Sequence, residues 1–226
     1  MTDRISIAVD GPAASGKGTA ARGVAQALDY AYIDTGAMYR AVGLAAQARG
    51  LPLSDEAAVG AVAQALEFGF SWDGGVLRLS VDGQDVTQAI RTEAAGRGAS
   101  AVATLPAVRR ALVAQQQKLA DRGGVVMDGR DIGTVVLPDA HLKVFLDASV
   151  EVRAARRHAE LQARGDTRAL SEVLSDLKAR DHQDRTRAAD PLRPADDAVL
   201  LDSSRLEPAE VIDRILTLAA EAGARA

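Results

Sequence analysis

Short runs of hydrophobic residues recur along the chain, and each leads into an aspartate. These runs are residues 5–9, 30–33, 125–127, 142–146 and 199–201, and the aspartates are Asp10, Asp34, Asp128, Asp147 and Asp202. Short runs of three to five mainly apolar residues, here with Ser6 and Lys143 as the polar exceptions, are typical of strands in a parallel sheet. The pattern therefore predicts five strands with a carboxylate at the end of each.

Segments with the 3.6-residue period of an amphipathic helix separate these runs. The clearest are residues 17–28, 107–119, 150–161 and 211–218. Strands that alternate with helices indicate an α/β fold in which a doubly wound parallel sheet has helices on both faces. Ligands of such folds bind beyond the carboxyl ends of the strands, which is where the aspartates are expected.

Residues 41–98 depart from this alternation. Ser54 is an expected N-cap for a helix that runs to about Leu66. The segments 68–72 and 76–81, with turns at 73–75 and 82–83, have the alternation of a small antiparallel meander. We therefore expect an inserted subdomain over 41–98 in a core domain formed by residues 1–40 and 99–226.

Composition removes several classes of chemistry. The 226 residues contain no cysteine, which excludes disulfides, cysteine-ligated zinc, iron–sulfur clusters and a thiol nucleophile. No apolar run approaches the roughly 18 residues that a membrane span needs, and the chain begins without a secretory pattern. We therefore expect a cytoplasmic protein without a membrane partner.

The distribution of charge favours a small anionic ligand. The net charge is −4, which gives no general attraction to a nucleic acid polymer. Nine arginines nevertheless fall between Arg153 and Arg193. A local excess of guanidinium groups suits phosphate, because the planar fork donates two parallel hydrogen bonds.

A phosphate-binding loop follows the first predicted strand directly. It consists of Gly11, Pro12, Ala13, Ala14, Ser15, Gly16, Lys17, Gly18 and Thr19. Glycines allow the backbone N–H groups to turn toward phosphate oxygens, the helix N-terminus adds partial positive charge, and Lys17 adds a full charge. The strand, loop and helix in this order predict a site for ATP.

The position after Lys17 departs from the common form of this loop. Gly18 stands where a Ser or Thr hydroxyl usually binds Mg²⁺. Thr19, Ser15 or a water are the alternatives for the metal. Asp128, at the end of a predicted strand, is a further candidate, directly or through water.

Residues 180–187 are open to two interpretations. Arg180 with Asp184, and Asp181 with Arg185, are pairs of opposite charge four residues apart, as on an ordinary solvated helix. Arg180, Asp184 and Arg187 also share one stripe at i, i+4 and i+7, which would present two cations and a carboxylate together. The phosphate-binding loop in the same chain favours the second interpretation.

Four motifs together resemble the bacterial cytidylate kinase family of nucleoside monophosphate kinases. They are Gly-Lys-Gly-Thr in the loop, residues 34–40, residues 128–134 and residues 180–187, and the inserted segment from Phe68 to Val86 agrees. The resemblance implies a P-loop fold with a five-stranded sheet, a nucleotide-binding insertion and a short lid at 153–166. It further implies transfer of the γ-phosphoryl group of ATP, with Mg²⁺, to CMP or dCMP.

The resemblance also assigns roles to individual residues. It implies that Arg40, Arg130 and Arg187 hold the acceptor phosphate, that Ser100, Arg109 and Asp131 read the cytosine, and that Thr35, Arg180 and Asp184 contact the sugar. Arg156 and Arg157 would close over the transferring group. The expected catalytic residues are Lys17, Arg130, Arg156, Arg157 and Arg187.

Two other functions are alternatives to phosphorylation of CMP. A GTPase switch usually carries an Asn-Lys-x-Asp motif for its base, and the chain contains no asparagine. A P-loop kinase for another small acceptor, such as a different nucleoside monophosphate or a shikimate-like molecule, remains the alternative. We expect a monomer in either case.

Overall fold

The chain divides into two units by its internal contacts. The computed structural model describes residues 4–73, 76–121 and 123–224. One unit is formed by Met1–Tyr32 with Ala120–Ala226, and the other by Ile33–Leu119. The expected turn at 73–75 includes residues 74–75, which lie outside the described residues, as do residues 1–3. The boundaries 41–98 and 153–166 remain a prediction.

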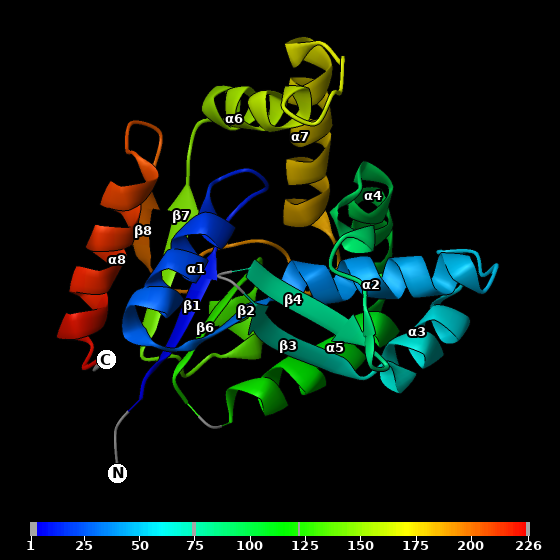
Figure 1. Ribbon diagram of the computed structural model, residues 1–226, viewed down its shortest axis with the longest axis horizontal. Helices are drawn as coiled ribbons and strands as arrows, with labels where there is room; N and C mark the ends of the chain where they lie inside the picture. Colours follow the sequence, from blue (N-terminus) through cyan, green and yellow to red (C-terminus); the bar gives the residue numbers. More distant parts are fainter. Residues whose placement is uncertain (1–3, 74–75, 122, 225–226) are drawn as a thin grey trace. The chain divides into compact units, whose positions relative to one another are not determined.

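A five-stranded sheet forms the centre of the first unit (Figure 1). The strands are β1 (Ser6–Asp10), β2 (Ala31–Asp34), β6 (Val125–Gly129), β7 (Leu142–Asp147) and β8 (Val199–Asp202), in the order β2-β6-β1-β7-β8. The central strand β1 runs parallel to both β6 and β7, and β8 runs parallel to β7. The predicted parallel α/β sheet is confirmed, with the five aspartates inside the strands as last or next-to-last residues.

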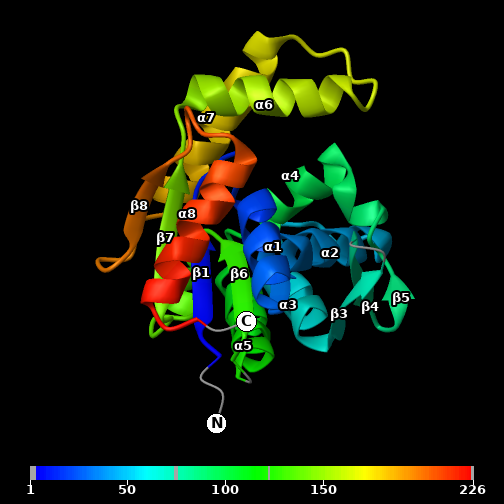
Figure 2. The same ribbon diagram turned by 60° about the vertical axis from the view of Figure 1, so that its left-hand side comes forward.

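Helices α1 (Lys17–Leu28) and α8 (Pro208–Glu221) lie side by side against this sheet (Figure 2). Their buried faces carry small and branched residues, including Val24 on α1 and Ile215 on α8. Helices α6 (Val150–Gln162) and α7 (Leu170–Thr186) pack against each other. Ser149 caps α6 by accepting a hydrogen bond from the backbone N–H of Val152 at 3.4 Å.

The second unit combines helices with a small antiparallel sheet. Its elements are α2 (Thr35–Ala48), α3 (Glu56–Ala65), β3 (Phe68–Asp73), β4 (Val76–Val81), β5 (Gln84–Asp85), a 3₁₀ turn η1 (Ala89–Arg91), α4 (Glu93–Val102) and α5 (Pro106–Ala120). The sheet order is β3-β4-β5, with Phe68 opposite Val81. The predicted meander is therefore confirmed.

The start of α3 corrects one prediction. Asp55, rather than Ser54, is the N-cap, because its carboxylate accepts a hydrogen bond from the N–H of Ala58 at 3.0 Å. Both residue types are good caps, and a carboxylate adds a favourable interaction with the helix dipole.

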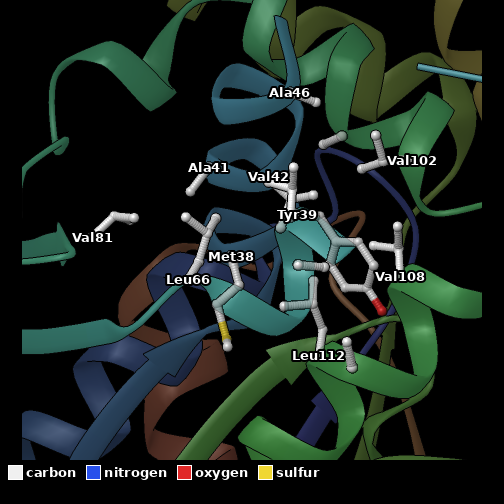
Figure 3. Packing of buried hydrophobic residues seen from close by; sticks show 14 of the residues in the cluster. Met38, Tyr39, Ala41, Val42, Ala46, Leu66, Val81, Val102, Val108 and Leu112 are labelled. Atoms are coloured by element: carbon white, nitrogen blue, oxygen red, sulfur yellow. The ribbon is translucent and has the colours of Figure 1, made fainter. Parts of the chain in front are cut away.

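Buried side chains of the second unit form one apolar cluster (Figure 3). The ring of Tyr39 projects from α2 toward Val108 and Leu112 of α5. Helices α2 and α4 approach closely at two glycines, since a Cβ at Gly43 would lie 3.1 Å from the carbonyl carbon of Gly98. Small residues at this crossing allow the two backbones to meet.

Candidate active site

The loop that follows β1 has the conformation of an anion-binding loop. Ala14 and Gly16 have left-handed φ angles of 60° and 90°. Left-handed residues in alternation with ordinary ones turn successive N–H groups to one side, as in a nest for an anion. Helix α1 begins at Lys17, and Gly16 provides no side-chain cap for its first turn. The N–H groups of that turn therefore suit phosphate oxygens.

Three further contacts define the loop. A Cβ at Gly11 would overlap the backbone oxygen of Leu146, so only glycine fits where the loop passes the end of β7. The ammonium group of Lys17 donates a hydrogen bond to the carbonyl of Pro12 at 3.3 Å and so lies across the loop. The hydroxyl oxygen of Ser15 is fully buried without a hydrogen-bond partner among the described residues.

Asp128 lies beside this loop. Its Oδ1 accepts a hydrogen bond from the hydroxyl of Tyr32 at 2.7 Å, and its Oδ2 is 3.9 Å from the position of a Cβ at Gly18. Asp128 is 6 % exposed. A buried carboxylate near the first turn of α1 is a suitable oxygen donor for Mg²⁺.

Arg130 and Asp184 form a buried ion pair at the carboxyl end of β6. Nε of Arg130 donates to Oδ2 of Asp184 at 2.8 Å. Burial by itself would lower the pKa of Arg130, but the carboxylates of Asp184, Asp128 and Asp10 raise this pKa above its ordinary value. Burial opposes ionisation of Asp184, yet the nearby arginines, Arg130 first, hold its pKa below the usual range. Both groups are therefore charged at neutral pH.

A second ion pair lies in the same unit. The guanidinium of Arg187 is 3.6 Å from Oδ1 of Asp131, and both side chains are almost completely buried. Nε of Arg187 also donates to the carbonyl of Asp190 at 2.9 Å. The structure thus brings together the predicted phosphate ligand Arg187 and the predicted base-reading carboxylate Asp131.

The position of Arg187 corrects the expected helical stripe. Helix α7 ends at Thr186, and Arg187 is its C-cap with extended φ and ψ angles of −58° and 143°. Arg180 and Asp184 do lie on α7, but Arg187 reaches Asp131 from the segment that leaves the helix. Helical spacing therefore does not explain why Arg187 is buried, whereas its ion pair does.

Asp10 connects these pairs to the phosphate-binding loop. Its two carboxylate oxygens accept hydrogen bonds from the N–H groups of Ile132 and Gly133, each at 2.8 Å. These residues begin the π-helical turn η2 (Ile132–Val136), directly after Asp131. Because Asp10 directly precedes Gly11, its carboxylate links the residue before the loop to the first turn of η2. Burial raises the pKa of Asp10 to about 7 despite these two bonds.

Four of the predicted CMP ligands belong to the second unit. Thr35 is buried at the start of α2, and Arg40 on the same helix forms an ion pair with Asp34 at 2.6 Å. Ser100 of α4 donates to the carbonyl of Gly96 at 3.3 Å. Arg109 of α5 is 2 % exposed, with its guanidinium 5.8 Å from the centre of the Tyr39 ring.

The two predicted lid arginines both contact protein groups. Arg156 donates to the hydroxyl of Ser203 at 3.1 Å and to the Ser203 carbonyl at 2.7 Å. Arg157 pairs with Glu160 at 2.8 Å on the exposed side of α6. Their predicted role at the transferring phosphoryl group remains a prediction.

Sequence reasoning missed several residues that organise the site. The sequence pattern marks Asp10 only as the end of a strand and assigns no role to Arg153, Tyr32 or Ser203. Asp10 carried a signal, because a carboxylate between a buried strand and a glycine-rich loop must find N–H partners when it is buried. No local pattern singles out Arg153 among the arginines of α6.

No described helix is long and apolar enough to cross a membrane.

Comparison with known proteins adds independent evidence on the family. A model of the cytidylate kinase family matches residues 7–221. Curated cytidylate kinases from Desulfitobacterium hafniense and Rhodococcus jostii are 48% and 45% identical to the chain. The alignments cover 96% and 97% of the chain and 94% and 96% of the two relatives.

Solved structures agree at the level of the fold. An unliganded sugar kinase from Janibacter sp. HTCC2649 superposes with a TM-score of 0.50 at 18% identity, with 99% of each chain covered. Such a likeness shows the fold alone and indicates no substrate. The family match spans the loop at Gly11, the Asp128 to Gly133 segment and the Arg180 to Arg187 segment in one alignment. From its sequence and its fold, the chain belongs to the cytidylate kinase family.

Proposed function

We propose that the protein transfers the γ-phosphoryl group of ATP to CMP or dCMP and forms CDP or dCDP. The observation that carries this proposal is the pair of buried ion pairs, Arg130 with Asp184 and Arg187 with Asp131. The carboxylate of Asp10, directly before Gly11, accepts hydrogen bonds from the N–H groups of Ile132 and Gly133, which follow Asp131 in the chain. Two arginine side chains that are oriented by carboxylates suit a doubly anionic phosphate acceptor.

The transfer itself requires little covalent chemistry from the protein. A phosphate oxygen of CMP forms a bond to the γ-phosphorus, while the bond to the bridging oxygen breaks and ADP leaves. A phosphate monoester has a second pKa of about 6, so at neutral pH the attacking oxygen is already ionised and needs no general base. The protein's contribution is therefore the alignment of two anions and the compensation of their charge.

Lys17 would act on the donor side, with the backbone N–H groups of the loop from Gly11 to Thr19 around the ATP phosphates. Arg130, Arg187 and Arg40 would hold the acceptor phosphate. The Nε of Arg40 is buried and without a hydrogen-bond partner among the described residues, which supports a ligand at this guanidinium. Arg156 and Arg157, in a lid over residues 153–166, would neutralise the transferring group and exclude water.

The base and sugar contacts would give specificity. Asp131 can accept a hydrogen bond from the 4-amino group of cytosine, whereas uracil presents an acceptor oxygen at that position. Ser100 and Arg109 would contact the ring, and Thr35, Arg180 and Asp184 the sugar. By the resemblance to cytidylate kinases, the segment 41–98 would act as the nucleotide-binding insertion. We also propose that the protein is a cytoplasmic monomer.

The residues around the loop fit a bound Mg²⁺. Asp128 and the unpartnered hydroxyl of Ser15 are hard oxygen donors, and Thr19 adds a second hydroxyl. Among the described residues no three acidic or histidine side chains gather as a metal site by themselves. Mg²⁺ commonly binds through one or two carboxylates plus substrate phosphates. When bound, the ion would neutralise charge on the β- and γ-phosphates of ATP.

An acceptor profile tests the proposal. ADP release would be measured with ATP, Mg²⁺ and each of CMP, dCMP, UMP, AMP and shikimate. We expect CMP and dCMP to be the best acceptors, with kcat/KM for CMP at least about tenfold above UMP. A higher kcat/KM for AMP or shikimate than for CMP would show that CMP is not the preferred acceptor. It would leave the proposed ATP site unchanged.

A further inference from the structure

The phosphate-binding loop contains one strained residue that is not glycine. Ala14 has a φ of 60°, in the left-handed region, which a residue with a Cβ adopts only at an energetic cost. A loop in this conformation also turns carbonyl groups away from the anion, and buried carbonyls need donors. Something outside the loop must therefore hold it in place.

The two carbonyls that flank Ala14 both have such a partner. The carbonyl of Ala13 accepts a hydrogen bond from the guanidinium of Arg153 at 3.1 Å. The hydroxyl of Ser203 lies 3.1 Å from the carbonyl of Ser15 and 3.1 Å from the carbonyl of Asp147, and its one proton can be donated to either of them. The strained residue is thus bracketed by one anchor from helix α6 and one from the segment after β8.

Arg153 is itself held rigidly. It is 4 % exposed, and its Nε donates to the carbonyl of Ala148 at 2.9 Å. Its other two nitrogens donate to the two oxygens of Asp181 on α7, at 3.1 and 2.6 Å. A guanidinium that makes all these bonds has one orientation, so its contact with Ala13 is fixed in position.

Apolar packing reinforces this link. The side chain of Ala13 is buried in a small cluster with Ala154 and Leu161 of α6 and with Val173 and Leu177 of α7. The loop is therefore attached to the α6 and α7 pair by a charged hydrogen bond and by apolar contact. Asp181, which orients Arg153, directly follows Arg180 and precedes Asp184 by three residues on α7.

We propose that Arg153 is a positioning residue, which keeps the phosphate-binding loop in its anion-binding conformation and connects that loop to α7. This inference rests on the proposed role of the loop as the ATP site. Arg153 contacts neither nucleotide in this scheme and acts through the carbonyl of Ala13. Without Arg153, the segment around Ala14 relaxes to other conformations. Part of the binding free energy of ATP is then used to order the loop, which weakens the affinity.

The test compares Arg153→Lys and Asp181→Asn with the wild type. Lysine keeps the positive charge and the apolar stem but cannot reach Ala13, Ala148 and both oxygens of Asp181 together. We expect the Kd for a non-hydrolysable ATP analogue with Mg²⁺ to rise by about tenfold or more in Arg153→Lys, the scale of one lost charge-assisted hydrogen bond. Asp181→Asn, which keeps one acceptor oxygen, should raise it less.

Amide hydrogen exchange of the loop provides a readout that a purely stabilising residue would not change. In the absence of nucleotide, the N–H groups of residues 14–16 should exchange faster in both variants, while those of β1 keep wild-type protection. Asp176→Asn is the matched control, because Asp176 lies on the same helix with its side chain 70% exposed and pairs only with Arg168 among the contacts described. It should leave both the Kd and the exchange of the loop unchanged.

The outcomes separate this proposal from the proposed function. Folded Arg153→Lys and Asp181→Asn proteins with wild-type affinity for the analogue and wild-type loop exchange would overturn it, even if their melting temperatures fall. If Arg153→Lys does not fold, Asp181→Asn decides the question by the same two measurements. Neither measurement needs an acceptor, so failure of the wild type to phosphorylate CMP would reject the proposed function without bearing on Arg153.

Discussion

Four buried charged side chains in the candidate site are stabilised because each has a charged partner. Burying an isolated charge would cost several kcal/mol, and an isolated buried carboxylate would take up a proton. Arg130 with Asp184, and Arg187 with Asp131, avoid this cost by direct pairing. The pairing also keeps the arginines extended and oriented before a phosphate arrives, which is the condition for electrostatic catalysis without reorganisation.

Lys17 provides the first prediction. Lys17→Ala should leave the fold intact and lower kcat by about 10²–10³-fold or more, the scale for one preorganised charge at the transition state. The loss is expected because the ammonium group lies across the loop on Pro12. Steady-state kinetics check it, with Lys118→Ala as control, since Lys118 is an exposed lysine in the last turn of α5. If folded Lys17→Ala keeps the wild-type kcat, the assignment of the ATP site to this loop is wrong.

Asp131 provides the second prediction. Asp131→Ala should reduce the ratio of kcat/KM for CMP to that for UMP from at least about tenfold to near one. The substitution also frees Arg187 from its partner, so both substrates should lose activity. The ratio is therefore the informative quantity, and it corrects for any general damage. An unchanged ratio would assign the base contact to another residue.

Elements place residues that lie far apart in the sequence at one edge of the sheet. The last residues of β1 and β6 are neighbours because the two strands are parallel, with Asp10 opposite Gly129. Asp10 then captures the first turn of η2, and the segment after α7 brings Arg187 to Asp131. The order of strands, with β1 between β6 and β7, puts the loop where ligands bind in this class of sheet.

The end of α7 yields the third prediction. Arg187→Ala should lower kcat/KM for CMP by at least about tenfold more than Arg185→Ala, because the Arg187 side chain is 5% exposed and paired with Asp131. Arg185 is the matched control, since it is 47% exposed and 3.7 Å from Asp147. Both changes remove one positive charge from the same segment. Equal losses would mean that the segment acts only through its net charge.

The stability of the whole molecule should respond to pH through Asp10. Its pKa is about 7 in the folded protein and 3.8 in an unfolded chain. Because the folded state retains the proton longer, the contribution of Asp10 to the free energy of unfolding is greatest below about pH 4. It falls by about 1.36 kcal/mol per pH unit between these pKa values and levels off above pH 7.

Asp10→Asn gives the fourth prediction, since asparagine does not titrate. The free energy of unfolding of the wild type should fall relative to that of Asp10→Asn as pH rises from 4.5 to 7.5. Urea unfolding at four pH values measures it, and the difference cancels the groups common to both proteins. A difference that stays constant over this range would mean that Asp10 is ionised throughout.

The sequence by itself determined the elements and the chemistry that depend on neighbours along the chain. The five strands with their aspartates, the helix from Lys17 to Leu28 and the meander at 68–81 follow from local periodicity, and the structure contains all of them. The loop from Gly11 to Thr19 was recognisable because glycine spacing and a lysine are local features. The loop together with the motifs at 34–40, 128–134 and 180–187 also indicated the protein family.

Only the tertiary structure decided which charges meet. Asp10 bonds to Ile132, Asp131 pairs with Arg187, and Arg153 bonds to Ala13 and Asp181. These partners lie 28 to 140 residues apart in the chain, so no short window of sequence contains both members of a pair. Helical spacing suggested a stripe that included Arg187, but the helix ends one residue earlier and an ion pair places the side chain. Periodicity reports which face of an element is apolar, whereas the pairing of buried charges depends on how elements pack. That physical difference explains why the loop was evident from the sequence and its anchors were not.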